Sequence, residues 1–450
     1  MLAVPRRPAD HPADDLRRAR FFGSAVFFFN GLVFASLVPR LPEIRTALDL
    51  GPAAYGLVVA AMPAGALSLG LLAPRTMARL GTARVATLGM IVLAAVFALV
   101  GAAPVAVLFA AGMFLAGGTD AIVDVAQNSH ALRLQRLYGR SIITSFHALW
   151  SFGSLTGGVL GSVAAGAGLP VAWHMLVIAV LTSLAMLASR GGLLPDDGPA
   201  TLDTSPGSAL PAEGGLATIP VETPRIATGS SDPGRDSRCL DERSEQGGAK
   251  QDDRADGPVA GSRRPVRPWA MLAVLGAIGT VGAMVEDGGS NWSGVHLDVT
   301  HHLSPGITGL GFVLFTAGML AARLLADRVI DRFGRRAVVG VGGLGVAVGF
   351  ALAALWPEPV AAVAGFAIAG VGTAALIPLA MDAADEIVGL APGVGLTVVS
   401  WVLRAGSLLS PVVVGAVAEV TGVGHALLLI AAAGAIVAVC SRALPARRAG

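Results

Sequence analysis

The chain has 450 residues, of which 54% are hydrophobic and 14% charged, and its mean hydropathy is +0.69. Soluble domains carry about 25% charged residues, so this composition excludes a disordered protein, a small disulfide scaffold and an ordinary soluble enzyme. The formal net charge of +2 is too small to indicate a nucleic-acid partner. Cys239 lies in a polar stretch and Cys440 in an apolar one, so we expect no disulfide, and no cluster predicts a metal site.

The first part of the chain predicts a bundle of transmembrane helices. Residues 1–20 are polar and are expected to form a cytoplasmic tail. Six apolar runs then follow across 21–188, each close to the length of about 20 residues that a helix needs to cross a bilayer core of about 30 Å. The first run is longer than a signal-peptide core and lacks a cleavage site, so we expect it to be retained. The runs cover approximately 21–39, 54–73, 83–102, 105–126, 142–165 and 170–188.

A polar segment separates these runs from a second set. Residues 189–267 are rich in Pro, Gly, Ser and Asp, a composition that predicts a disordered cytoplasmic linker, with a regulatory or partner-binding segment as the alternative. A second six-helix bundle is expected across 268–442, followed by a cytoplasmic tail at 443–450. Its apolar runs cover approximately 268–286, 305–326, 337–356, 359–380, 393–417 and 424–442.

Arginine placement predicts the orientation in the membrane. Arginines precede the first run, occupy alternate loops and follow the last run, which favours cytoplasmic termini and a multi-pass protein of the cell inner membrane. Two features run against this pattern. Arg40 and Arg45 fall on the outer side, and an acidic loop at 382–386 falls on the cytoplasmic side. We expect Arg40 and Glu43 to form an exposed cluster beside an outer gate.

The two halves repeat each other at a constant offset of 253 residues. Three independent matches share this offset, which predicts two bundles of the same topology with a binding site between them near the middle of the membrane. The expected fold class is therefore an all-α integral membrane protein with twelve transmembrane helices in two parallel six-helix repeats. The matches pair Arg79-Leu80-Gly81 with Arg332-Phe333-Gly334, Gly117 with Gly370, and Gly153-Ser154-Leu155 with Gly406-Ser407-Leu408.

The segment at 327–336 resembles the loop signature of the major facilitator superfamily, and the resemblance extends over the hydrophobic chain. It implies a cytoplasmic gate in which an Asp pairs with Arg and accepts from amides at a helix N-terminus. The first-half copy keeps Arg79 and Gly81 but lacks the Asp. The residues that carry the signature in the second half are Asp327, Arg328, Asp331, Arg332, Gly334, Arg335 and Arg336.

Three further stretches, at 117–128, 145–151 and 286–293, resemble the branch of that superfamily that contains the fucose permease and the YbjJ-like proteins. This resemblance implies proton coupling by an acid four residues before an Asn, a spacing that Asp124 and Asn128 match. The permease's acid in the first helix has no counterpart between Asn30 and Arg40, so its coupling chemistry cannot be transferred whole.

The residues themselves point to the same region. Asp120 and Asp124 are one helical turn apart, and Asn128 continues that face. Because an ionisable group inside a bilayer is costly, such a pair suits proton binding and release. His147, three residues before Trp150, could relay protons. The alternatives are a structural carboxylate pair bonded to neighbouring helices and a histidine that only packs.

Several polar or aromatic residues within the apolar runs are candidates for substrate binding. Each has a structural alternative, such as polar contacts between helices, an outer-loop cap or an interfacial aromatic. The candidates are Asn30, Asn128, Trp150, Glu286, Asn291 and Arg404. Hydrolase, P-loop and zinc-protease motifs are absent, so we expect neither an enzyme nor a cofactor.

These observations favour a secondary active transporter that works by alternating access. The prediction is proton-coupled import of a small sugar-like polar solute, with proton-coupled efflux of drugs or metabolites as the alternative. The aromatic content of 5% argues against a large hydrophobic drug pocket. A membrane sensor that transports nothing is a second alternative. The expected partners are a small-molecule substrate, protons and the lipid bilayer, with no nucleic acid, and a monomer is expected.

Overall fold

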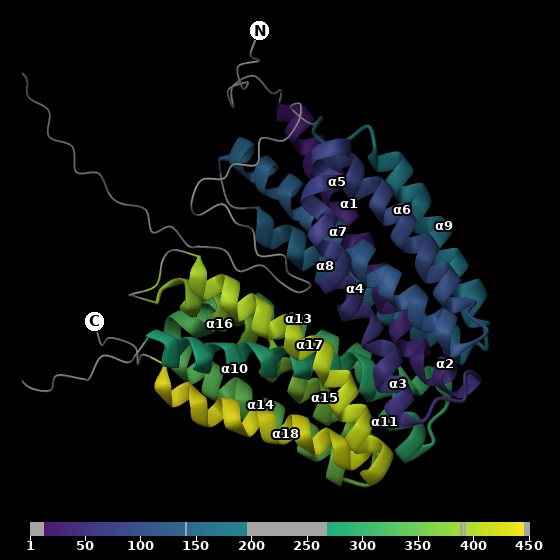
Figure 1. Ribbon diagram of the computed structural model, residues 1–450, viewed down its shortest axis with the longest axis vertical. Helices are drawn as coiled ribbons and strands as arrows, with labels where there is room; N and C mark the ends of the chain where they lie inside the picture. Colours follow the sequence, from purple (N-terminus) through teal and green to yellow (C-terminus); the bar gives the residue numbers. More distant parts are fainter. Residues whose placement is uncertain (1–12, 140–141, 196–267, 388–389, 391–392, 445–450) are drawn as a thin grey trace, which may run out of the picture. The chain divides into compact units, whose positions relative to one another are not determined.

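The computed structural model describes residues 13–139, 142–195, 268–387, 390 and 393–444. All regular secondary structure in these ranges is helical (Figure 1). Twelve segments of the described chain are long and apolar enough to cross a membrane, which confirms the predicted twelve-helix fold. Most of the predicted linker, residues 196–267, and the predicted tail at 445–450 lie outside the described residues.

The first bundle contains six membrane-length segments, several of which are broken into shorter helices. Prolines stand in the first turn of α2 and of α3, where a missing amide hydrogen costs nothing. The elements are α1 (Ala13–Leu37), η2 (Val38–Arg40), α2 (Leu41–Ala47), α3 (Pro52–Val59), α4 (Ala61–Leu69), η3 (Gly70–Leu72), α5 (Ala73–Leu80), α6 (Thr82–Gly101), α7 (Ala106–Tyr138), α8 (Ile143–Gly166) and α9 (Val171–Ser189).

The second bundle repeats this plan, and its first segment contains a π-helix. Prolines again stand in the first turn of α12 and of α15. The elements are α10 (Pro268–Asp287), the π-helix η4 (Gly288–Trp292), α11 (Ser293–His301), α12 (Pro305–Thr308), α13 (Leu310–Phe333), α14 (Arg335–Leu355), α15 (Pro359–Thr373), α16 (Leu376–Asp385), α17 (Val394–Thr421), α18 (Val423–Cys440) and η5 (Ser441–Ala443).

The first helix begins inside the segment predicted to be a tail at 1–20. Helix α1 starts at Ala13, before the apolar run begins. Asp14 and Asp15 lie in its first turn, where the helix dipole favours negative charge, and Arg17 pairs with Asp14 at 3.5 Å. Apolar runs therefore locate the part of a helix that lies in the bilayer but miss the polar turns that extend beyond it.

The internal repeat is visible in how the helices touch. Helix α7 approaches α4 through Gly117, where a Cβ would meet the carbonyl oxygen of Met62. Helix α15 approaches α13 through Gly370, where a Cβ would meet the carbonyl oxygen of Phe315. Both glycines and both carbonyls are separated by the same 253 residues. The reciprocal contacts keep this offset as well, with Gly65 on Phe114 and Gly318 on Ala367.

The two bundles meet at one end of the helices. Helix α3 packs on α17, α8 on α12 and α13, and α2 on α11. Helices α2, α3 and α11 lie near one another in Figure 1. Glycines allow close approach here: a Cβ at Gly56 would lie 3.2 Å from the Cα of Gly415, and one at Gly166 would lie 3.3 Å from the Cα of Gly306. We call this region, residues 39–56, 162–169, 291–309 and 411–419, the closed end.

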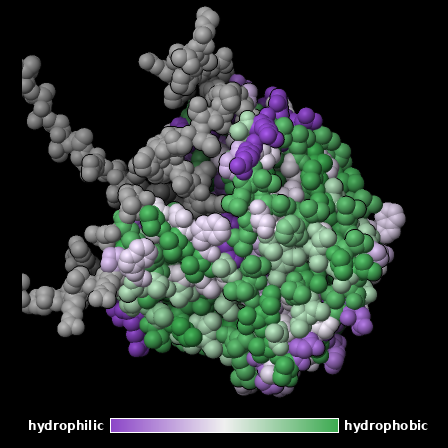
Figure 2. Space-filling model, in the orientation of Figure 1, coloured by the Kyte–Doolittle hydropathy of each residue, from purple (hydrophilic) through white to green (hydrophobic). Residues whose placement is uncertain are grey.

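The surface of the helices suits a lipid environment. Figure 2 shows a largely hydrophobic face over the described helices. Helix α9, for example, exposes Val177, Val180, Leu181 and Leu184, each by more than a third of its surface. Contiguous exposed apolar area of this kind is rare on soluble monomers and is the normal surface of a membrane helix.

Candidate functional site

A cavity of about 280 Å³ lies between the two bundles. One wall comes from α1, α3, α4, α7 and α8, and the other from α10, η4, α13, α16 and α17. Residues from both halves of the sequence therefore face a single space. Eight of the nine residues predicted to couple protons or bind substrate line it: Asn30, Asp120, Asp124, His147, Trp150, Glu286, Asn291 and Arg404.

Asp120 is held by a chain of hydrogen bonds that crosses three helices. Asn30 on α1 donates from Nδ2 to Asp120 Oδ1 at 2.9 Å, and the indole nitrogen of Trp150 on α8 donates to Asn30 Oδ1 at 2.7 Å. Helix α1 can approach α8 this closely because Gly31 faces the Trp150 carbonyl. The predicted substrate ligands Asn30 and Trp150 therefore orient a carboxylate in addition to lining the cavity.

Asp124 has its own set of amide donors. Gln127 Nε2 and Asn128 Nδ2 donate to Asp124 Oδ1 at 3.1 and 3.0 Å. Asn128 is not part of the cavity lining, so the structure places it behind Asp124. From the opposite wall, Arg404 on α17 acts electrostatically on Asp124. Asp124 and Arg404 thus line the same cavity from opposite bundles.

His147 lines the cavity but is not bonded to either aspartate. Its ring meets Phe27 edge-on at 5.4 Å, and within the described chain its Nε2 atom has no hydrogen-bond partner. Within the described residues, the charge of Arg323, which belongs to the other bundle, acts on His147. A relay from His147 to the aspartates would need a rearrangement or an intervening water.

The second wall holds an ion pair that sequence reasoning missed. Arg323 on α13 pairs with Glu286 on α10 at 2.8 Å, and its side chain is 9% exposed. The available signal was an arginine inside the apolar run at 305–326. Gln127 and Tyr55 were missed as well, although each is a polar residue in an apolar helix. Glu286 is thus already occupied by a protein cation in this conformation.

The predicted gate motif has a different set of partners from the expected one. Arg335 pairs with Asp382 and Glu386 at 2.5 Å each, and the guanidinium holds the pKa of the Glu386 carboxyl below its ordinary value. Gly334 supplies the turn, with φ of 82°, and Gly81 supplies its counterpart with φ of 84°. The other motif side chains are exposed: Asp327, Arg328, Asp331, Arg332, Arg336 and Arg79.

The motif is therefore bonded, in the described chain, to the last turn of α16 and the residue after it, because α16 continues through Asp385 where the sequence predicted an acidic loop. The acids that engage Arg335 are Asp382 and Glu386 rather than the motif's own aspartates. This pairing also accounts for the acidic residues at 382–386 that ran against the arginine pattern, because their charge is balanced by Arg335 at the start of α14.

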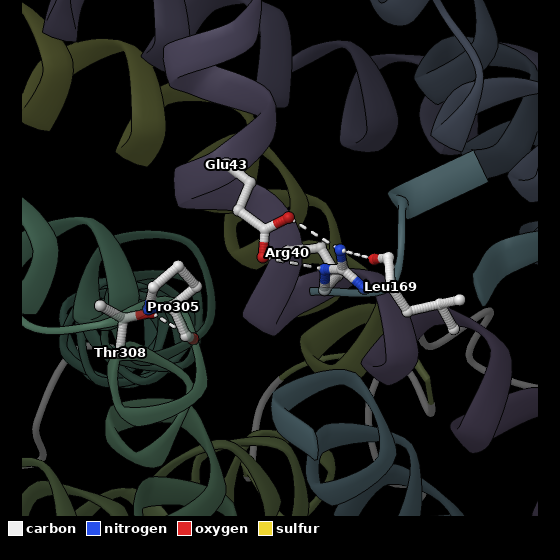
Figure 3. Close-up of polar contacts among 5 residues, drawn as sticks. All are labelled: Arg40, Glu43, Leu169, Pro305 and Thr308. Atoms are coloured by element: carbon white, nitrogen blue, oxygen red, sulfur yellow. Dashed lines mark hydrogen bonds and ion pairs between the residues drawn. The ribbon is translucent and has the colours of Figure 1, made fainter. Parts of the chain in front are cut away.

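The expectation of an exposed cluster at Arg40 and Glu43 is wrong for Arg40. Its side chain is 1% exposed and forms a two-pronged pair with Glu43, at 3.1 and 2.7 Å. It also donates to the Leu169 carbonyl at 2.5 Å (Figure 3). The elbow η2 turns the arginine inward, and Glu43 follows three residues later on the same side. Arg40 therefore ties the first segment to the loop between α8 and α9.

The sequence comparisons agree with this architecture. Residues 271–449 match the Major Facilitator Superfamily. An uncharacterized transporter of Sinorhizobium fredii, y4wD, is 27% identical over 421 residues, which cover 94% of this chain and 97% of that protein. The membrane protein MosC of Rhizobium meliloti is 28% identical over 429 residues, covering 94% and 89%. These similarities support the major facilitator superfamily.

Solved structures establish the fold. The nucleoside transporter NupG superposes with a TM-score of 0.65 at 12% identity, covering 94% of this chain and 98% of NupG. The fucose:proton symporter of E. coli superposes with a TM-score of 0.54 at 14% identity, covering 94% and 97%. The chain thus has the fold of major facilitator transporters, whereas the fucose-permease and YbjJ-like branch stays a prediction.

Proposed function

We propose that this chain is a proton-coupled secondary transporter that imports a small, sugar-like polar solute by alternating access. The observation that carries the proposal is a cavity walled by both bundles and lined by the two half-buried carboxylates of Asp120 and Asp124. A site at the interface of two repeats can be exposed to either side when the bundles rock about it.

Asp124 is the proposed proton carrier, and Asp120 supports it. Two carboxylates one turn apart in a membrane cavity disfavour double ionisation, so proton binding is coupled between them. Arg404 belongs to the opposite bundle, so its attraction to ionised Asp124 depends on the relative position of the two bundles. Protonation of Asp124 would weaken that attraction and let the bundles separate at this point, which links proton uptake to the conformational change.

A polar solute suits the hydrogen-bonding groups of the lining. Besides the acids, the cavity exposes amides and hydroxyls from both bundles, which match the alternating donors and acceptors of a polyhydroxylated molecule. Those groups are Asn30, Gln127, Ser154, Ser290, Asn291, Thr316, Ser400 and Ser407.

Efflux of a more lipophilic compound is the second candidate, and the same cavity offers a specific reason for it. The lining also includes aromatic rings and flexible thioethers, which adapt to varied apolar shapes. These residues are Phe34, Phe312, Phe315, Met62, Met113, Met319 and Met381. A sensor that transports nothing has no comparable support among the described residues.

The proposed orientation places both termini in the cytoplasm and the closed end outside, in the cell inner membrane. Burial of Arg40 in a pair with Glu43 supports it, because this arginine no longer counts as a free outer-side cation. The pairing of Arg335 with Asp382 removes the second exception in the same way.

The test is a comparison of purified wild type with Asp124→Asn and Asp120→Asn in proteoliposomes. A thermal-shift screen of sugars, amino acids, organic acids and lipophilic cations first identifies a stabilising solute. Both variants should lose accumulation driven by an imposed pH gradient, while Asp124→Asn keeps exchange of the solute between the two sides. Asp15→Asn, at an exposed position on α1, is the matched control. Full gradient-driven accumulation by both cavity variants would refute the proposed carboxylates.

A further inference from the structure

A partly buried hydrogen bond joins the two bundles at the closed end. Tyr55 on α3 donates from its hydroxyl to the carbonyl oxygen of Asn291 in η4 at 2.7 Å. Its ring meets Trp292 edge-on, with centroids 5.2 Å apart and planes at 87°. Tyr55 is 1% exposed and Trp292 is 0% exposed. Because the Tyr55 side chain is almost fully shielded from solvent, the bond favours contact between the bundles more strongly than an exposed one would.

The π-helix makes the acceptor available. Residues Gly288–Trp292 form a wide turn that interrupts the α-helical ladder, a feature frequent at functional sites. Gly289 lets this turn pack against the ring of Phe315, which a Cβ would approach to 2.7 Å. Within the turn, the Gly289 carbonyl accepts from the Ser293 hydroxyl, and the Asn291 carbonyl accepts from Tyr55. Two main-chain carbonyls of the π-helix thus accept hydrogen bonds from side-chain hydroxyls.

The same turn reaches the cavity on its other side. The Asn291 side chain donates from Nδ2 to Asp287 Oδ1 at 2.5 Å. Asp287, Ser290 and Asn291 all line the cavity. Asn291 therefore contacts a cavity carboxylate through its side chain and the opposite bundle through its main chain. A change at one contact is transmitted to the other through a single residue.

We propose that Asp287, Asn291 and Tyr55 form a latch that holds the closed end shut and is controlled from the cavity. A solute group that hydrogen-bonds to Asp287 competes with Asn291 Nδ2, which frees the π-turn to shift and withdraws the Asn291 carbonyl from Tyr55. Asp287 and Asn291 are positioning residues of this latch. The inference rests on the proposed alternating access, but it concerns the second bundle rather than the Asp120 and Asp124 pair.

The experiment measures opening of the closed end away from the latch itself. Ser162 on α8 faces Gly309 between the bundles and is 7% exposed. A Ser162→Cys reporter, in a chain whose Cys239 and Cys440 are replaced by Ser, is labelled with a bulky water-soluble maleimide in detergent. Both ends of the protein face water in detergent, so the rate reports opening whatever the orientation. Neither a solute nor a proton gradient is needed.

Tyr55→Phe keeps the ring on Trp292 and removes only the hydroxyl. It should raise the labelling rate about three- to tenfold, the population shift expected for one partly buried hydrogen bond. Asn291→Ala keeps the backbone acceptor and removes the link to Asp287, and it should raise the rate about two- to fivefold. Tyr138→Phe alters the only other tyrosine of the chain, at the end of α7, and should leave the rate unchanged.

An unchanged rate in Tyr55→Phe overturns the latch. A rise in Tyr55→Phe without one in Asn291→Ala overturns control from the cavity. If Tyr55→Phe does not fold, Asn291→Ala carries the test, since it leaves Tyr55 and its acceptor in place. Because labelling requires no transport, a negative result here is separate from a failure of the aspartate variants in proteoliposomes.

Discussion

Alanine at Gly117 or Gly370 should destabilise the protein, although alanine is the better helix former. Alanine is favoured over glycine within a helix by about 0.5–1 kcal/mol. At these two positions, however, the added Cβ would overlap the backbone carbonyl oxygens of Met62 and Phe315. A backbone oxygen cannot rotate away, so the two helices must move apart. Overpacking of this kind costs about 1–3 kcal/mol, which leaves a net loss of up to about 2.5 kcal/mol after the helix-propensity gain.

Gly276 on α10 provides the matched control. A Cβ there would lie 3.4 Å from Val402 Cγ1 and 3.8 Å from its Cβ, an ordinary contact with a side chain. Gly276→Ala should therefore be neutral or stabilising by about 0.5 kcal/mol. Substitution by Ala should therefore lower the free energy of unfolding at Gly117 and leave it unchanged or raise it at Gly276, although both substitutions add one methyl group to an apolar helix.

The assay measures the apparent unfolding temperature of each detergent-purified variant. The readout is the fraction of protein that remains monodisperse after heating. Gly117→Ala and Gly370→Ala should both lower this temperature, and by similar amounts, because their contacts are equivalent in the repeat. Gly276→Ala should leave it unchanged or raise it. The reasoning is refuted if Gly117→Ala and Gly370→Ala match Gly276→Ala, or if they shift the temperature in opposite directions.

Two further predictions concern ion pairs. Glu43→Gln leaves the charge of the Arg40 guanidinium, which is 1% exposed, without an anion and should cost about 2 kcal/mol or more. Arg40→Met leaves Glu43, which is 28% exposed and can reach water, and should cost about 1 kcal/mol. Equal unfolding temperatures would contradict this order. Arg335 lowers the pKa of Glu386, so their bond stabilises the fold above the ordinary glutamate pKa of 4.5 and is lost as the pH falls below it. At pH 7 the wild type should have a higher unfolding temperature than Glu386→Gln. The difference should correspond to less than about 1 kcal/mol, because the pair is exposed. It should disappear near pH 3, and a difference that persists at pH 3 would contradict the stabilising role of this ion pair.

The sequence predicted the twelve helices, because a span of apolar residues is set by bilayer thickness and needs no tertiary information. It also predicted the repeat, since equivalent glycines such as Gly117 and Gly370 are required by close helix packing. It misplaced the start of α1, where polar residues continue the helix to Ala13. Capping and local charge decide whether residues outside the bilayer core are helical, and a hydropathy profile does not contain this information.

The candidate site was only partly accessible from sequence. Asp120 and Asp124 were found because they share a helix face, which is a local property. Arg323 was overlooked because its partner Glu286 is 37 residues away along the chain, and Arg40 was expected to be exposed because nothing local shows that it points inward. Partners distant in sequence are brought together only by helix packing.

The sequence alone determined which residues could carry charge inside the membrane, and where the helices that hold them lie. Only the tertiary structure decided that Asp124 and Arg404 line one cavity from opposite bundles, that Asn128 donates to Asp124 from outside the cavity lining, and that Asn291 connects the cavity to Tyr55. The physical reason is that hydropathy and helical period are properties of one segment. Pairing, burial and access depend on which segments touch.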